Sequence, residues 1–277
     1  MNSPPLSELF PDEDYRHYLR LQTGVPAEFF APTAAHTALG SERAALLESA
    51  PARYAAWLPE AEPLLAETVE LAAEWDSITP AERDAINYAA TPFERCLTLG
   101  RAWEVDFLLL KPTLAGLPRL AGGCVCFPSS WSLEEKFGRE LPLIHEAVPG
   151  LNPQLGTPIN NFLNKLRPGV AFQRHNWGLS RWPDLNQHPA LGLSKLQPPL
   201  KLDEVWLRIE YQALVALPRS GGVLFGIRIA VHPLSAVATK PDAARGLHRA
   251  LQTMPEAMAR YKNLWAARDN LLRLLTS

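Results

Sequence analysis

Two stretches with strand-like alternation, residues 204–212 and 223–231, constrain the fold of this chain most strongly. In each stretch every second side chain is apolar, which is the period of a β-strand that buries one face. The residues LPRSGG at 217–222 separate the two stretches, and a short Gly-containing connection of this kind joins antiparallel strands. The sequence therefore predicts a β-hairpin in the second half of the chain.

Helical patterns precede and follow this hairpin. Apolar residues recur at three- and four-residue spacings from Ser41 to about Trp75, and residues 101–110 predict another helix. Residues 1–40 contain several prolines and aromatic residues, which indicates an extended arm with one short helix. Residues 240–276 return to helical spacing. This order of segments predicts an α+β fold, with an antiparallel sheet, flanking helices and a C-terminal helix.

The chain divides into two segments of different character. We expect residues 1–115 to form a mainly helical N-terminal extension that packs on a core of residues 116–277. Within the core, residues 130–135 start a helix that ends at Gly138, and a further helix runs from residue 158 to 166. With 277 residues, 47% of them apolar, we expect the two segments to form one structural unit around one core.

Charge and hydropathy exclude several classes of partner. The net charge of -2 and the pI near 6.4 leave no basic footprint for nucleic acid. No apolar stretch approaches the roughly 18 residues of a membrane-spanning helix, and the N-terminus is acidic where a signal peptide would be basic. Cys96, Cys124 and Cys126 do not make a disulfide framework. We therefore expect a cytoplasmic protein without a nucleic-acid or membrane partner, and the sequence leaves oligomerisation open.

Four side chains are candidates for chemistry. His145 lies between a short helical segment and a Pro-Gly turn, where the spacing alone favours a histidine that caps a helix end. Arg174 and Arg228 lie on predicted strands, where an arginine can bind a carboxylate, lie on a solvated face or pair with Glu210. Glu210 can hold a protonated amine or form a structural salt bridge. The hairpin register decides among these alternatives, and the sequence does not fix it.

A longer series of motifs, spread over residues 10–275, resembles one protein family. In chain order the motifs are Glu104-Val105-Asp106, Pro128 to Trp131, Glu135-Lys136-Phe137-Gly138, Ile144-His145 with Val148-Pro149, Arg174-His175-Asn176-Trp177, Arg208-Ile209-Glu210, Leu217-Pro218-Arg219-Ser220-Gly221 and Tyr261-Lys262. In this order they resemble the haem-dependent oxidative N-demethylase α-subunit-like proteins, in which a PAS-type domain serves as a haem enzyme.

The resemblance implies a PAS-like fold that binds haem b, with His145 as the iron ligand and His175 as its main rival. It implies catalytic roles for Glu210 and Arg228, which would set the polarity of the distal pocket. The residues that it implies for cofactor binding are His145, Arg174, His175, Asn176, Trp177 and Arg208.

The same resemblance implies an oxidoreductase that uses oxygen to N-demethylate a small amine. The chain shows no flavin, iron-sulfur or phosphate-binding glycine motif. The electrons would then come from a separate reductase, as the resemblance implies, or else from the substrate itself. Two alternatives stay open because a fold does not fix a function. One is a non-enzymatic haem sensor of gas or redox state, and the other is a small-molecule-binding protein without haem.

Overall fold

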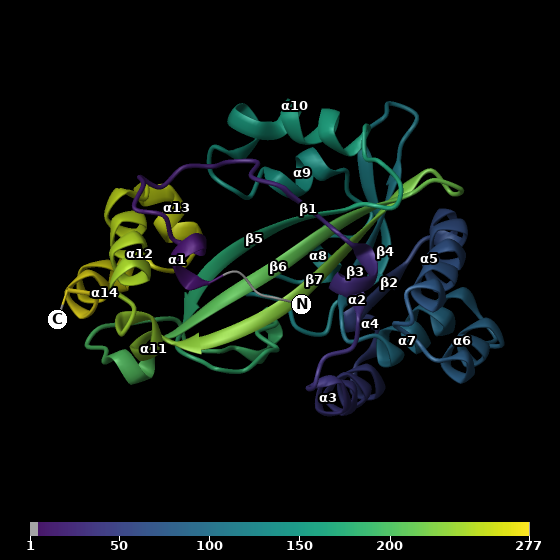
Figure 1. Cartoon of the computed structure of the whole chain (residues 1–277), viewed down its shortest axis with the longest axis horizontal. Helices are drawn as coiled ribbons and strands as arrows, with labels where there is room; N and C mark the ends of the chain where they lie inside the picture. The colour runs from purple at the N-terminus through teal and green to yellow at the C-terminus, as the bar shows by residue number, and fades with distance from the viewer. Residues whose placement is uncertain (1–4, 277) are drawn as a thin grey trace.

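The predicted hairpin lies in the middle of a seven-stranded sheet in the computed structural model, which describes residues 5–276 (Figure 1). Its strands are β6 (Trp206–Leu217) and β7 (Gly222–Pro233), which pair antiparallel along their whole length. The described strands follow the order β1-β5-β6-β7-β3-β4-β2, and every neighbouring pair is antiparallel. The other five are β1 (Gln22–Gly24), β2 (Ala55–Trp57), β3 (Asp106–Pro112), β4 (Pro118–Cys124) and β5 (Ala171–Ser180).

Helices flank both faces of the sheet, and three groups of them follow one another along the chain (Figure 1). The first group is α1 (Leu6–Leu9), α2 (Pro26–Phe30), α3 (His36–Ser49), α4 (Pro51–Tyr54), α5 (Glu62–Glu74), α6 (Pro80–Asn87) and α7 (Pro92–Ala102). The second is α8 (Leu133–Lys136), α9 (Leu141–His145) and α10 (Leu151–Leu163). The third is α11 (Leu234–Ala238), α12 (Pro241–Thr253), α13 (Glu256–Tyr261) and α14 (Arg268–Leu274). Within residues 5–276, none of these helices has the length and apolar character needed to cross a bilayer.

Local sequence signals explain where several helices begin and end. The Thr79 side chain accepts a hydrogen bond from the Glu82 amide at the start of α6, and the Glu82 side chain accepts one from the Thr79 amide. The Ser132 hydroxyl caps α8 in the same way by accepting from the Glu135 amide. Gly138 follows α8 with a φ of 75°, a conformation that favours glycine. These observations confirm the helix predicted to end at Gly138.

The strand register assigns each side chain of the hairpin to one face of the sheet. Glu210 on β6 lies opposite Asn176 on β5 and Ile229 on β7, so these three side chains share a face. Tyr211 lies opposite His175 and Arg228, whose side chains therefore project from the other face. We call the face of Glu210 the cavity face and the face of Tyr211 the core face.

Each face has its own apolar layer. The larger core packs the core face, through residues such as Ile209 and Phe107, against the N-terminal and C-terminal helices. A smaller cluster covers the cavity face and joins strand residues such as Leu108 and Ile227 to Ile159 and Leu163 of α10. The smaller cluster is incomplete, and the space beside it is the cavity described below.

Two sequence predictions in the N-terminal half are wrong. Residues 101–110 are not a helix, because α7 ends at Ala102 and β3 begins at Asp106. The stretch from Ser41 to Trp75 is helical only in part, since β2 interrupts it. β3 is a central strand whose residues 106–110 are all buried, and its apolar run Phe107 to Leu110 lacks the alternation of a strand with one solvated face.

The expected boundary between residues 115 and 116 falls in the connection between β3 and β4, which pair with each other. The N-terminal segment supplies three strands, β1, β2 and β3, to the same sheet as the hairpin. The ends of the expected segments, residues 1–4 and 277, lie outside the described residues. The mixed α+β class and the C-terminal helices are confirmed, and the PAS-like fold stays a prediction.

Candidate functional site

A cavity of about 510 Å³ lies on the cavity face of the sheet, within the range of pockets that hold small ligands and cofactors. It is bounded by the sheet on one side and by α9 and α10 on another, and it extends round the edge of β5. Beyond Gln173 that edge has no partner strand in the described chain. Its apolar walls include Leu108, Leu110, Leu120, Ile144, Leu151, Leu155, Phe225 and Ile227.

His145 lines this cavity from the last turn of α9, so its predicted place at a helix end is confirmed. Burial, together with the nearby charges of Lys136 and Arg174, lowers the pKa of His145 to about 4. No hydrogen bond to the His145 imidazole is found within the described part of the chain, although the His145 carbonyl accepts one from the Val148 amide. The ring is therefore neutral near pH 7 and offers an unprotonated nitrogen to a ligand.

Arg174 projects into the same cavity from β5. Its titratable neighbours are Tyr18, Glu210 and Tyr15, but among residues 5–276 it makes no hydrogen bond or ion pair. Burial lowers the pKa of this guanidinium from its ordinary value. A partly buried arginine with all its donors unused is the natural binding group for a carboxylate or another anion.

Glu210 is 7% exposed and faces the cavity from β6. Its Oε2 accepts hydrogen bonds from Gln212 Nε2 at 3.0 Å and from Asn176 Nδ2 at 3.5 Å. Its Oε1 accepts none from the residues that the structure describes. One carboxylate oxygen is thus held by the protein, while the other is available to a ligand.

Two lysines that the motifs contain, but to which the sequence assigned no role, also reach the cavity. Lys136, the last residue of α8, lies over the Trp131 ring, 4.4 Å from its centroid, and burial lowers its pKa. Lys262, directly after α13, donates to Trp177 O at 2.6 Å and to Asn176 Oδ1 at 3.2 Å. Burial lowers the pKa of Lys262 to about 8. Only their place in the family motifs distinguishes these lysines from ordinary surface lysines in the sequence.

Arg208 lies beside the cavity, but its donors serve the protein. Its Nε donates to Ser129 Oγ at 2.6 Å, and its Nη1 and Nη2 donate to the carbonyls of Asp184, Leu185 and Phe127. Burial lowers its pKa to about 10. Arg208 therefore fastens two loops to the sheet, with each of its three nitrogens donating to the protein, and the cofactor role that the resemblance implies stays a prediction.

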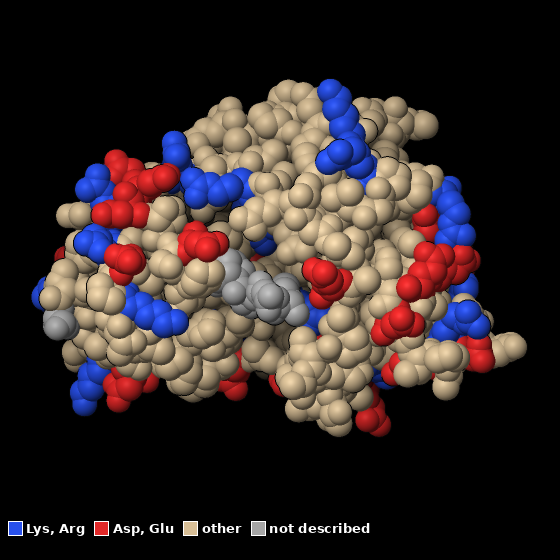
Figure 2. Space-filling view, in the orientation of Figure 1, with Lys and Arg blue, Asp and Glu red and all other residues tan. Residues whose placement is uncertain are grey.

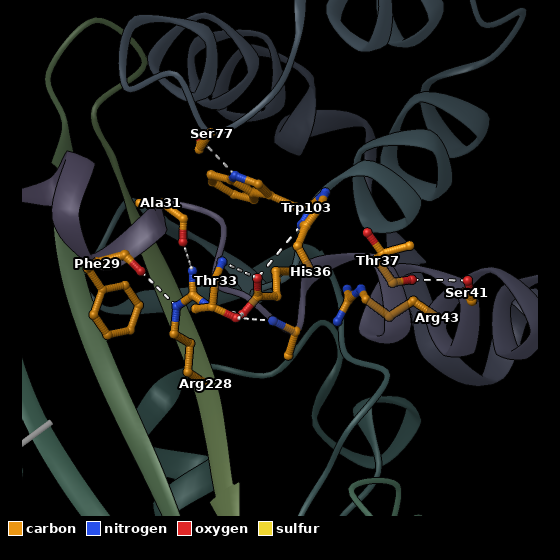
Figure 3. A network of polar contacts seen from close by, with 12 residues as sticks. Phe29, Ala31, Thr33, His36, Thr37, Ser41, Arg43, Ser77, Trp103 and Arg228 are labelled. Atoms are coloured by element: carbon orange, nitrogen blue, oxygen red, sulfur yellow. Dashed lines mark hydrogen bonds and ion pairs between the residues drawn. The ribbon is translucent and has the colours of Figure 1, made fainter. Parts of the chain in front are cut away.

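Arg228 does not share a pocket with Glu210, contrary to the prediction. The register places it on the core face, where it forms an ion pair with Glu104 and donates to the carbonyls of Phe29 and Ala31 (Figure 3). The Thr33 amide and hydroxyl donate two further hydrogen bonds to the Glu104 carboxylate (Figure 3). The Glu104 carboxylate thus holds Arg228 away from the cavity, in a network that joins β7 to the N-terminal arm.

His175 and Trp177 also lie on the core face and line the part of the cavity that passes round the β5 edge. His175 forms a hydrogen bond with the Leu9 backbone, and its Nε2 is buried without a partner in the described chain. Trp177 packs edge-on against Phe10, with 5.4 Å between ring centroids. His175 therefore projects from the core face of β5, whereas His145 belongs to α9, which covers the cavity face.

The N-terminal arm forms a further wall that the sequence did not predict. In Figure 1 it leaves α1 beside the C-terminal helices and passes near α9 and α10 on its way to β1. The Tyr15 amide donates to Thr253 Oγ1, and His17 Nε2 donates to Pro149 O at 2.8 Å. Gly246 of α12 allows the close approach, since a Cβ there would lie 1.8 Å from the Phe10 carbonyl oxygen.

Charged side chains strengthen this attachment. Arg249 pairs with Asp14, and Arg245 lies near Asp12, so the arm is linked to α12 at two further points. Figure 2 shows basic and acidic side chains mixed over the C-terminal helices on the viewed face, with no continuous basic stripe there. Tyr15 also faces the cavity, and burial raises its pKa to about 12, which keeps the phenol neutral.

A comparison with protein families agrees with these motifs. Residues 21–272 match the family model described as haem-dependent oxidative N-demethylase, alpha subunit-like. The chain belongs to this family. The name of the N-demethylase family places the chain with oxidative, haem-dependent demethylase-like enzymes, and it fixes neither the substrate nor the reductase.

The residues of the cavity fit the haem group that the N-demethylase family name implies. The walls are apolar, the His145 ring is neutral and without a hydrogen bond in the described residues, and Arg174 is a cation with unused donors. Residues 5–276 contain no group of three or more His, Cys, Asp or Glu side chains arranged to hold a metal ion by themselves. An apolar, iron-bearing cofactor with carboxylate groups matches what this cavity offers.

Proposed function

We propose that this protein uses oxygen to N-demethylate a small amine, with haem b held in the cavity and His145 as the iron ligand. The observation that carries the proposal is the combination, in one apolar cavity, of a neutral imidazole and the unpartnered guanidinium of Arg174. When bound, haem supplies the redox and oxygen chemistry of the reaction. The family membership supports the same assignment.

In this proposal the protein side chains bind, orient and exclude water. Arg174 would receive a haem carboxylate, because its donors have no other acceptor among the described residues. The free Oε1 of Glu210 would accept a hydrogen bond from the protonated amine and orient its methyl group. The leucine and phenylalanine walls lower the local dielectric, which strengthens the attraction between carboxylate and ammonium.

The remaining parts of the proposal concern the partners of the protein and its cellular localisation. The electrons would come from a separate reductase, since the sequence carries no flavin or iron-sulfur motif. We propose a cytoplasmic enzyme with a PAS-like haem-binding fold, and no role in binding nucleic acid or membrane. The net charge of -2 and the mixed charge of the face seen in Figure 2 support the last part of this proposal, because a nucleic-acid partner requires a basic patch.

The test is turnover of methylated amines by the haem-loaded protein. A chemical reductant, oxygen and a panel of secondary and tertiary methylamines are supplied, and formaldehyde release is measured. We expect formaldehyde with at least one amine, and a loss of about 10²-fold or more in kcat/KM for Glu210→Gln, which removes the carboxylate charge but keeps the shape. Haem binding without formaldehyde from any amine would instead favour the haem sensor.

A second outcome would reject both haem functions. Protein expressed with an adequate haem supply and showing no Soret band would contradict the proposal and leave the small-molecule-binding alternative. Lys195→Met serves as the control variant, because Lys195 is exposed and does not line the cavity.

A further inference from the structure

We infer that Lys262 is a positioning residue for amine binding, because its ammonium orients the Asn176 amide and Asn176 in turn orients the Glu210 carboxylate. The role of Glu210 as the amine-binding group rests on the proposed function. The two contacts, Lys262 with Asn176 and Asn176 with Glu210, do not depend on the proposed function. It runs from the segment after α13 to β5 and then to β6.

The first step is the contact between Lys262 and Asn176. Lys262 Nζ lies 3.2 Å from Asn176 Oδ1 and 2.6 Å from Trp177 O. An ammonium group can only donate hydrogen bonds, so the oxygen of the Asn176 amide must face it. Of the two orientations open to this amide, Lys262 therefore selects the one that turns Nδ2 away from the lysine.

The second step is the contact between Asn176 and Glu210. The two residues are directly opposite each other on β5 and β6, and Asn176 Nδ2 lies 3.5 Å from Glu210 Oε2. Gln212 Nε2 donates to the same oxygen at 3.0 Å. Two amide donors thus fix Oε2, and the carboxylate presents Oε1 to the cavity. With the Asn176 amide reversed, an oxygen would face Glu210 and repel it.

The surroundings of Lys262 differ from those of a lysine in a stabilising buried ion pair. Its direct partners are two neutral oxygens and the Trp177 ring, 5.2 Å away, and it has no carboxylate in contact within the described residues. A desolvated ammonium held by neutral groups contributes less to stability than a buried ion pair with full partners. Glu210 lies near enough to attract it through space. The arrangement places a fixed positive charge behind the amide that holds the carboxylate.

A purely structural role would be a clamp between α13 and β5. Both roles predict some loss of stability in Lys262→Met, so stability alone does not decide between them. They differ in the effect on KM for the amine and in the dependence of that effect on Asn176. A clamp would act through Trp177 O, whereas positioning requires the Asn176 side chain.

The experiment compares wild type, Lys262→Met, Asn176→Ala and the double variant, all loaded with haem, with dimethylamine as substrate. We expect KM to rise about tenfold in Lys262→Met, with a smaller change in kcat and an unchanged Soret band. Asn176→Ala should raise KM to a similar extent. The double variant should resemble Asn176→Ala, because the lysine acts through that side chain.

Two controls complete the kinetic test. Lys195→Met removes an exposed lysine and should leave KM at the wild-type value. Lys262→Arg keeps a donor and a positive charge, and it should restore KM to within about threefold of wild type. Multiplicative effects of Lys262→Met and Asn176→Ala, or an unchanged KM in Lys262→Met, would overturn the inference.

A structural measurement separates this inference from the proposed function. If the wild-type holoenzyme turns over no amine, the proposed function fails, and a crystal structure of Lys262→Met holoenzyme decides the inference. Loss of the Asn176–Glu210 contact or a displaced Glu210 carboxylate supports the positioning role. A Glu210 carboxylate that keeps its place and its Asn176 contact contradicts it.

Discussion

Arg228 on β7 and Arg174 on β5 project from opposite faces of the same sheet. They differ in whether the protein supplies acceptors for their hydrogen-bond donors. Arg228, on the core face, uses its donors on Glu104 and on two carbonyls of the N-terminal arm (Figure 3). Arg174, on the cavity face, has no such partner among the described residues. A buried cation with complete partners holds a fold together, whereas one without partners is a site for a ligand.

Other buried charges agree with this distinction. Arg43 is fully buried and pairs with Asp106, whose carboxylate also accepts the amides of Cys126 and Phe127. Arg208 binds carbonyls of two loops. Two charged groups that the protein leaves partly unsatisfied, Arg174 and Glu210, line the cavity.

The largest effect is expected for Arg228→Met. This change leaves the Glu104 carboxylate buried without its counter-ion, and breaking such a pair costs about 3–5 kcal/mol of unfolding free energy. Urea denaturation measures the loss. The double variant Arg228→Met with Glu104→Gln should recover part of the stability, and an Arg228→Met protein as stable as wild type would break the comparison.

A smaller loss is expected for Glu67→Gln at the turn of the hairpin. The Glu67 carboxylate of α5 accepts the amides of Arg219 and Ser220 and the Ser220 hydroxyl. Removing charge-assisted hydrogen bonds at this 4% exposed group should cost about 2 kcal/mol of unfolding free energy. Glu70→Gln, at a glutamate of the same helix whose ion pair with Arg219 is exposed, is the matched control and should cost much less, because exposed pairs contribute little to stability.

The same carboxylate predicts a pH dependence. Burial alone would raise the pKa of Glu67, but the hydrogen bonds from Ser220 and Arg219 outweigh it and hold the pKa below its usual value. Its contribution to stability is therefore complete above the unfolded-state pKa of about 4.3 and is lost as the pH falls through the lower folded-state pKa. Between about pH 5 and about pH 3, Glu67→Gln should therefore lose less unfolding free energy than wild type, and urea denaturation at each pH measures the difference. An equal loss in both proteins would contradict this account of the turn.

The smallest effect on stability is expected for Arg174→Met. Because Arg174 has no partner to lose in the described chain, the unfolding free energy of the haem-free protein should change by less than about 1 kcal/mol. The affinity for haem should fall about tenfold, the size of one lost charge-assisted contact. Denaturation and a haem titration on the same protein check both parts. A large loss of stability with unchanged haem affinity would place Arg174 with the structural arginines.

The sequence predicted the hairpin, because alternation of apolar residues is a strong signal when one side chain in two is buried. It did not predict β3, whose residues Phe107 to Leu110 are apolar without interruption. A short apolar run of this kind is equally typical of a buried helix. The position of the strand between two others, and not its own residues, makes it a strand.

The candidate site was predictable in part for a similar reason. His145, Arg174, Asn176 and Glu210 were named from motifs, and the structure brings all four to one cavity. Arg228 was misplaced because the hairpin register decides the face of every side chain, and a shift of one residue exchanges the faces. The wall formed by residues 9–18 depends on long-range contacts with α12, which no local pattern encodes.

The most direct test of the account is a haem titration of His145→Ala beside His175→Ala, followed by absorption spectroscopy. His145 lies in α9 over the cavity face and His175 projects from the core face of β5, so the variants separate the two sides of the sheet. We expect His145→Ala to lose haem or to change the spin state of the iron, and His175→Ala to keep the wild-type spectrum. A wild-type spectrum in His145→Ala, together with loss of haem in His175→Ala, would contradict the central claim and move the iron ligand to the core face.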